Sequence, residues 1–350
     1  MMTDTKIERK TETRVVWVDV AKGIGTFLIV LGHLLYVCKP SEINQAIYSF
    51  HIPMFFFLSG FMIKRKKDEK FFTFAKKKFL RLIVPAVFYM VVMLPIFFVY
   101  QNPHSTTKTL KLIFYYEGKL AFNDPCWFFI VLFEMLILER ILHVKEQSTT
   151  TKTLVATFFL LMGFLIYQNS IFLPFGIDRA FVCFVFILAG EIVKDIIDKL
   201  KKYRNIKWWN VLSIMVVSGA IWVIIAVFIN PKISIYSMKL RNYWFFVLAA
   251  GFGTMCYCCL CYLIAKPLKF LGVVGKNNLF VSGTHYAPVF FFKRFAKMKH
   301  FAYTYRCTIY SVLLAIAILS VSIPIDILVR KYFPWPVGER KRKNSAKKTE

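Results

Sequence analysis

Acidic side chains are scarce in this sequence. Asp and Glu supply 19 of its 350 residues, whereas Lys and Arg supply 47, so the formal net charge is +28. In a soluble protein such an excess would suggest that nucleic acid is bound. Here the basic residues stand in short clusters between apolar runs, which is typical of the loops of a membrane protein. We therefore predict membrane lipids, and no nucleic acid, as partners.

The common signatures of nucleotide and metal chemistry are also missing. The sequence contains no phosphate-binding loop, no dinucleotide-binding glycine pattern and no His-Glu-x-x-His pair. Its eight cysteines indicate no extracellular disulfide framework. Cys256, Cys258, Cys259 and Cys261 would be spread around a helix with no histidine or acid nearby, so we reject a zinc site there. With Cys183, they are predicted to be small buried hydrophobic side chains, and we expect neither a metal nor a permanently bound cofactor.

Apolar residues, by contrast, are abundant. The hydrophobic residues make up 57% of the chain, and Phe alone occurs 38 times. A membrane-crossing helix needs roughly 20 mostly apolar residues. By that measure we predict an all-α integral membrane protein, a bundle of about ten transmembrane helices. The predicted spans are 20–38, 46–63, 80–100, 127–142, 154–175, 178–194, 211–229, 243–264, 278–292 and 308–329.

The loops between these spans are short and unequally charged. The longest, 101–126, is too small to fold alone, so any chemistry must take place within the bundle. Placing both termini in the cytoplasm puts most Lys and Arg residues inside, which predicts an N-in/C-in topology. The basic 293–306 segment is the exception, and indicates either a miscounted span or a cationic external surface facing anionic lipid or substrate. We expect a membrane domain at 1–335 and a basic, disordered cytoplasmic tail at 336–350.

Ionisable groups inside a span are costly to bury, which makes each one a candidate functional residue. The first span contains Asp19, Lys22 and His33. Lys22 and His33 are eleven positions apart, close to three helical turns, so they share one helix face about 16 Å apart along the axis. An imidazole titrates near neutral pH and has two usable nitrogens, so His33 is a candidate general base. The alternative is a histidine bonded to a neighbouring helix and a lysine that reaches the interface.

Other polar residues have a functional and a structural interpretation. His51 is a site residue or an interfacial histidine. Ser59, which precedes Gly60 and lies in no Gly-x-Ser-x-Gly turn, is a site residue or a mark of close helix packing. The basic run that ends at Arg81 either anchors the topology on anionic lipid or binds a polyanion such as a nucleotide phosphate. His285 is a second site histidine or a packing one.

The remaining intramembrane polar residues are Trp127, Glu134, Arg179 and Glu191. Arg179 and Glu191 are twelve positions apart, so they share a helix face but are too distant to pair. We therefore expect each of the two to have a partner on another helix.

Taken in order, these residues resemble the acyltransferase-3 family, polytopic O-acyltransferases that acetylate bacterial surface glycans. The family's first span typically carries a basic residue, ten intervening positions and a histidine, which Lys22 and His33 match. Further landmarks are similar to Phe56-Phe57-Leu58-Ser59-Gly60-Phe61, Lys78 and Arg81 before Leu82-x-x-Pro85, Trp127-Phe128-Phe129, and Gly275-Lys276-Asn277 with His285. The run Phe50-His51-Ile52-Pro53-Met54-Phe55 resembles a fucose O-acetyltransferase-like subgroup. Lys78 replaces the Arg usual in the family and so loses bidentate phosphate geometry, and the extracytoplasmic hydrolase-like domain of some relatives is absent.

The resemblance implies a multi-pass enzyme of the bacterial inner membrane with acetyl-CoA as co-substrate. The acceptor would be a hydroxyl of a cell-surface polysaccharide or of its polyprenyl-linked oligosaccharide precursor. The catalytic residues would be His33, Asp19 and Lys22. Donor-binding residues would be Arg81, Lys78 and Ser59, and acceptor-binding residues would be His51, Trp127, Arg179 and His285.

Two other classes of protein compete with this interpretation. A secondary transporter or flippase would use buried histidines and acids as a proton relay, although the sequence shows no inverted repeat. A non-catalytic membrane scaffold would explain neither the buried histidines nor the register of Lys22 and His33. The sequence favours no particular number of subunits.

Overall fold

The computed structural model describes residues 15–64, 69–100, 123–203 and 207–339. Over these ranges the chain is helical, and its extended pairing is limited to an isolated bridge between Ser234 and Lys239. The longer helices are α1 (Val16–Leu35), α2 (Ser41–Phe61), α3 (Phe71–Tyr100), α5 (Trp127–Ile141), α6 (Thr149–Gln168), α7 (Ile177–Tyr203), α8 (Trp208–Val223), α9 (Tyr243–Ile264), α12 (Tyr286–Met298) and α13 (Tyr305–Tyr332). The short ones are α10 (Gly272–Lys276), α11 (Asn278–Thr284), η1 (Asp124–Cys126), η2 (Val144–Glu146), η3 (Pro174–Gly176), η4 (Ile224–Ile229), η5 (Lys269–Leu271) and η6 (Trp335–Val337). The predicted all-α class is confirmed for these residues.

Six helical segments of the described chain are long and apolar enough to cross a membrane: Val16–Leu35, Phe71–Ile96, Thr149–Gln168, Trp208–Ile229, Tyr243–Ile264 and Tyr305–Tyr332. They leave large apolar side chains on the surface, such as Phe228, which is 76% exposed, and Leu313, which is 59% exposed. Surfaces of this kind suit lipid and not water. The chain is therefore a multi-pass membrane protein, whereas the predicted count of ten spans is not confirmed.

The other predicted spans differ from these six. α2 and α7 are long helices of more polar composition, and α5 has only 15 residues. The prediction of one continuous span at 278–292 is wrong, because this segment is divided at His285 into α11 and α12. Pro288 is the physical reason: it has no N–H to donate to the carbonyl of Thr284, so the ladder of helical hydrogen bonds is interrupted there.

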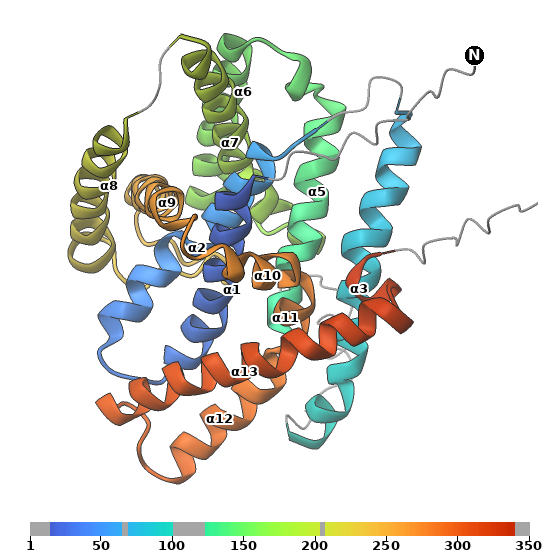
Figure 1. Ribbon diagram of the computed structural model, residues 1–350, viewed down its shortest axis with the longest axis vertical. Helices are drawn as coiled ribbons and strands as arrows, with labels where there is room; N and C mark the ends of the chain where they lie inside the picture. The colour runs from blue at the N-terminus through green and yellow to red at the C-terminus, as the bar shows by residue number, and fades with distance from the viewer. Residues whose placement is uncertain (1–14, 65–68, 101–122, 204–206, 340–350) are drawn as a thin grey trace, which may run out of the picture.

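Glycines bring helix backbones into contact around α1 and α2. α1 runs through the middle of the bundle beside α10 and α11, with α8 and α9 on the left and α3 on the right (Figure 1). A Cβ at Gly23 would collide with the carbonyl of Leu271, and one at Gly275 with the carbonyl of Asp19. In the same way Gly60 lies against the carbonyl of Ile187. The Ser59-Gly60 pair is therefore a site of close packing between α2 and α7.

The buried charges of α7 are paired. Glu191 lies 3.6 Å from the ammonium of Lys152 on α6, and Lys152 also contacts Asp195 at 2.6 Å. The expected interhelical partner of Glu191 is thus confirmed. Arg179 differs from expectation, because it pairs with its own neighbour Asp178 at 2.6 Å and donates to the carbonyl of Tyr236 from a connecting segment. Pairing of this kind offsets the cost of burying the charges.

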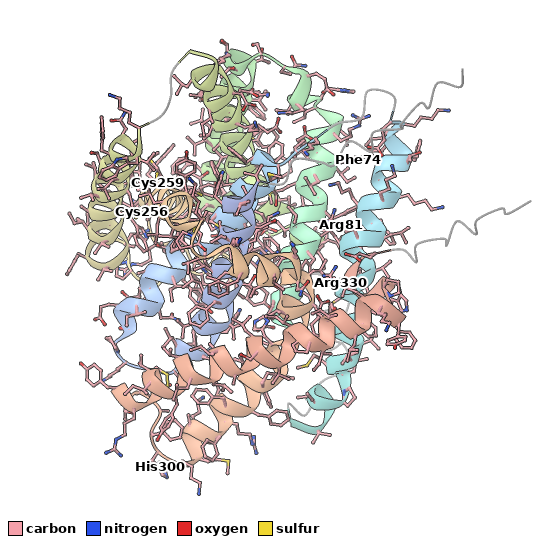
Figure 2. All side chains as sticks on the ribbon, viewed as in Figure 1. Phe74, Arg81, Cys256, Cys259, His300 and Arg330 are labelled. Carbon is pink, nitrogen blue, oxygen red and sulfur yellow. A yellow bond between two sulfur atoms is a disulfide. The ribbon has the colours of Figure 1, made fainter. Side chains whose placement is uncertain are left out.

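A disulfide joins Cys38, directly after α1, to Cys307 in the first turn of α13. The expectation that no cysteines form a disulfide framework is therefore wrong. The two cysteines are 269 positions apart in the sequence, and they meet only because the first and last long helices pack together. Cys183 and Cys261 are buried as predicted, and Cys256 lies on α9 where its sulfur approaches Gly219 of α8 (Figure 2).

The described chain continues beyond residue 335. Pro336 and Val337 in η6 are buried, and Gly338, with φ +71, packs against the backbone of Arg81 on α3. A side chain at Gly338 would collide with that backbone, so the close approach requires glycine. Glu339 follows η6, and its carboxylate contacts Arg330 of α13. Residues 340–350, most of the segment expected to form a disordered tail, lie outside the described residues.

Candidate active site

The ring of His33 lies near the C-terminal end of α1, among other aromatic rings. It is partly buried, and its Nδ1 lies 3.4 Å from the hydroxyl of Tyr48 on α2. The ring centroids of His285 and Tyr286 lie 5.2 Å and 6.2 Å away. α1, α2 and the α11–α12 junction thus meet around one imidazole, and the Tyr48 contact holds its orientation.

Two more imidazoles share this region and have a defined tautomer. In both, Nδ1 lies against the backbone carbonyl four residues earlier: His51 against Ile47 at 2.7 Å and His285 against Val281 at 2.9 Å. A carbonyl can only accept, so Nδ1 carries the proton and, in the neutral ring, Nε2 carries the lone pair. Nε2 of His285 is buried and has no hydrogen-bond partner within the described chain. The helix break at His285 therefore places Nε2 of this residue, an acceptor without a hydrogen-bond partner in the described chain, on a ring beside that of His33.

A partly buried carboxylate, Asp124 of η1, lies on the far side of Tyr286. It accepts hydrogen bonds from the hydroxyls of Tyr286, at 3.1 Å, and Tyr236, at 3.2 Å. Burial raises the pKa of the Asp124 carboxyl, and the two hydroxyls oppose this shift by stabilising the ionised form. Asp124 fixes the ring of Tyr286 that packs against His33, and so it is a positioning residue of the site.

Trp127 and Arg179 extend the same network. The ring of Trp127 lies 6.2 Å from that of Tyr236. The backbone carbonyl of Tyr236 accepts hydrogen bonds from two nitrogens of Arg179. Because Arg179 also binds Asp178, its guanidinium is already engaged by protein groups. Arg179 supports the wall of the site through Tyr236, and among the described residues nothing brings it to His33 directly.

A second group of site residues gathers toward the other end of α1. Lys78 of α3 is within electrostatic range of the cations Arg81 and Lys22, and also of the carboxylates of Glu139 and Glu69. Arg81 is exposed, whereas Arg140, Arg179 and Arg330 are held by carboxylates or carbonyls. Figure 2 labels Arg81 on α3 and Arg330 on α13. Three cations that approach one another are suited to a polyanion such as a chain of phosphates.

The contacts of Asp19 and Ser59 are with backbone groups. The backbone of Asp19 packs on Gly275 and its Cβ lies near Gly272, at the contact of α1 with α10. The Ser59 hydroxyl donates to the carbonyl of Phe55 on its own helix, at 2.8 Å. Ser59 is eight residues from His51, about 12 Å along α2, so the two do not share a site. The structure thus brings together His33, His51 and His285, and separately Lys22, Lys78 and Arg81.

Sequence reasoning missed Tyr48, Asp124, Tyr236 and Tyr286. Asp124 stands three residues before Trp127, and this nearness to a family landmark was the available signal. Asp124 lies in the predicted 101–126 loop, where a carboxylate is common. The tyrosines are common aromatic residues in an apolar chain, and only their hydroxyl contacts reveal a role.

The arrangement can perform proton transfer in an environment with little water. Unprotonated imidazole nitrogens lie at one end of α1, and a cationic cluster lies at the other, on a helix face about 16 Å long. Groups of three or more potential metal ligands are not found among the residues that the structure describes. The fold and site define a helical, multi-pass membrane protein with a histidine centre.

Comparison with known families identifies the class of chemistry. A family model described as an acyltransferase domain matches residues 15–327, which includes both groups of site residues. The chain therefore belongs to the acyltransferase-3 family. Neither a curated protein nor a solved structure matches the chain.

Proposed function

We propose that the protein is an O-acetyltransferase of the bacterial inner membrane. It moves an acetyl group from cytoplasmic acetyl-CoA to a hydroxyl of a cell-surface polysaccharide or of its lipid-linked precursor, with the fucose O-acetyltransferase-like proteins as its nearest subgroup. The observation that carries this proposal is the placement of His33 beside two further imidazoles, those of His51 and His285. His33 itself shares a face of α1 with Lys22.

The donor binds at the cationic cluster. Arg81, Lys78 and Lys22 hold the phosphates of acetyl-CoA, and the thioester reaches along α1 toward His33. Membership of an acyltransferase family supports an acyl donor such as a thioester. The phosphates of CoA supply the negative charge that the cationic cluster would bind.

Transfer takes place at His33. In one route a ring nitrogen of His33 removes the proton of the acceptor hydroxyl, whose oxygen attacks the thioester carbonyl. The carbon–sulfur bond then breaks, and the CoA thiolate takes up the proton. In the other route a nitrogen of His33 attacks the thioester carbonyl, and the carbon–sulfur bond breaks with the CoA thiolate as leaving group. The acceptor oxygen then takes the acetyl group from the imidazole, and the hydroxyl proton passes to the CoA thiolate. Tyr48 and Tyr286 orient the ring in both routes, and His51 and His285 border the acceptor.

The disulfide supports the N-in/C-in orientation. Disulfides form in oxidising compartments. Cys38 follows the end of α1 that carries His33, and Cys307 lies at the start of α13, so we assign this end of the bundle to the extracytoplasmic side. Lys22, Lys78 and Arg81 then face the cytoplasm, where acetyl-CoA is found. The donor and the acceptor enter from opposite ends of the same helix face.

This orientation predicts how the disulfide responds to reagents. We expect a membrane-impermeant maleimide to label intact cells at Cys38 and Cys307 only after treatment with an impermeant reductant. The matched control is the double variant C38S/C307S, which should lose the reductant-dependent label. Labelling that requires cell lysis would place this end inside and contradict the orientation.

A transport assay separates the proposal from its main rival. The purified protein in lipid vesicles is given labelled acetyl-CoA and a surface-glycan pool from the source cells. We expect label in the glycan. In a separate measurement on cells lacking the gene, mass spectrometry of the surface glycan should show loss of the same acetyl groups. Uptake of glycan or acetyl donor into the vesicles without transfer would indicate a transporter or flippase instead.

A further inference from the structure

Lys293 of α12 lies beside the histidine centre but has no place in the mechanism above. It is seven residues after Tyr286, close to two helical turns, so the two side chains share one face of α12 about 10 Å apart. Its ammonium lies 5.1 Å from the centroid of the Tyr36 ring, directly after the end of α1. Lys293 therefore lies close to the end of α1, the helix that carries His33.

The electrostatic neighbours of Lys293 are the groups of the site. Its charge acts on His33, His285 and Asp124. Asp124 already accepts hydrogen bonds from two tyrosines, and within the described chain no carboxylate lies within 4 Å of the Lys293 ammonium. Burial lowers the pKa of Lys293 to about 8, because the charged form is poorly solvated. A cation in this state is stabilised by an anion that enters the site.

A cationic approach leads outward from Lys293. Lys297 follows one turn later on the same face and acts on Lys293 electrostatically, and Lys299 is exposed at the end of α12. Like charges placed in a row raise the local concentration of anions and guide them inward. The apolar side of α12 bears the exposed rings of Phe291 and Phe295, which suits a helix lying at a membrane surface.

We propose that Lys293 selects acceptors that carry an anionic group, a phosphate or a carboxylate, close to the hydroxyl that is acetylated. The inference rests on the proposed function and names the substrate class of the same site. The anion binds Lys293 on the face of α12 that carries Tyr286, which places the neighbouring hydroxyl at His33. A neutral acceptor lacks this contact, so it binds more weakly.

The test uses the full-length protein in vesicles, labelled acetyl-CoA and the surface-glycan pool. Products are separated by anion exchange into neutral, carboxylate-bearing and phosphate-bearing glycans, with phosphatase treatment distinguishing the last two. We expect label mainly in an anionic fraction. Lys293→Gln should lower the rate constant kcat/KM for that fraction at least about tenfold, the effect of one charge-assisted hydrogen bond, and change neutral transfer less than twofold. Lys293→Arg should keep most of the preference.

Controls separate this inference from the proposed function and from misfolding. Lys266→Gln removes an exposed cation between α9 and η5, outside this row of lysines, and should change the anionic-to-neutral ratio little. The KM for acetyl-CoA should stay constant in Lys293→Gln, because the donor binds at the other end of α1. Equal losses for neutral and anionic glycans, or label mainly in the neutral fraction, would overturn the role of Lys293 and leave the acetyltransferase intact. Absence of transfer into every fraction by the unchanged protein would overturn both.

Discussion

Replacing His33 by Ala should lower acetyl transfer by about 100- to 10,000-fold, the usual contribution of a positioned general base. The ring contacts Tyr48, Tyr286 and His285. His285 and His51 have their Nδ1 engaged by backbone carbonyls, so neither can turn to replace it without losing that hydrogen bond. The measurement is the initial rate of label transfer from acetyl-CoA to glycan by protein in vesicles.

The matched control for this variant is His143→Asn, which removes an exposed imidazole after α5 at a left-handed backbone position that Asn tolerates. Its transfer rate should equal that of the unchanged protein, and both variants should show the unchanged thermal unfolding. Incubation with labelled acetyl-CoA and no acceptor, followed by a denaturing quench, separates the two routes, since only an acyl carrier retains label on the protein. Rates for His33→Ala within a few fold of the unchanged protein would remove His33 from the chemistry.

Much of the fold follows from local sequence. Runs of about 20 apolar residues predict helices wherever they occur, because a helix satisfies its own backbone in lipid. The spacing of Lys22 and His33 places them on one face by helical geometry alone, and the structure retains that helix as α1. Exposed apolar faces such as that of Phe228 follow from the same composition.

What could not be predicted depends on contacts between distant segments. The disulfide of Cys38 and Cys307 requires the end of α1 to meet the start of α13. Asp124 acquires its role only because Tyr236 and Tyr286, from two other segments, both donate to it. The break at His285 could have been found, since Pro288 stands inside the predicted span and cannot donate to a helical carbonyl. Counting apolar residues along a segment does not detect that one of them lacks a backbone N–H.

In the proposed enzyme the two ends of α1 would serve the donor and the acceptor. Glycine contacts at Gly23 and Gly275 fix α1 against α10, and the hydroxyl of Tyr48 on α2 contacts the ring of His33. Lys22 and His33 keep a separation of about 16 Å along the axis because they belong to one helix. We therefore expect the length of the donor to position its thioester at the imidazole.

Arg81→Gln should lower kcat/KM for acetyl-CoA by about 10- to 100-fold, because a hydrogen bond between charged partners contributes about 1.5–3 kcal/mol. The loss should appear mainly in KM, since the phosphates lie far from the reacting carbon. Arg81→Lys should recover part of it, because an ammonium keeps the charge but not the bidentate geometry. Neither change should unfold the chain, as the Arg81 side chain is exposed and its backbone still packs on Gly338.

Acetyl-pantetheine, a thioester without nucleotide phosphates, provides the decisive comparison. The unchanged protein should use it poorly, and Arg81→Gln should change that low rate less than twofold, because the contact it removes is absent from this donor. Lys266→Gln, which removes an exposed cation between α9 and η5, should leave both donors unaffected. An equal loss with acetyl-CoA and acetyl-pantetheine would mean that Arg81 acts on the fold or the thioester, and the phosphate site would then have to lie elsewhere.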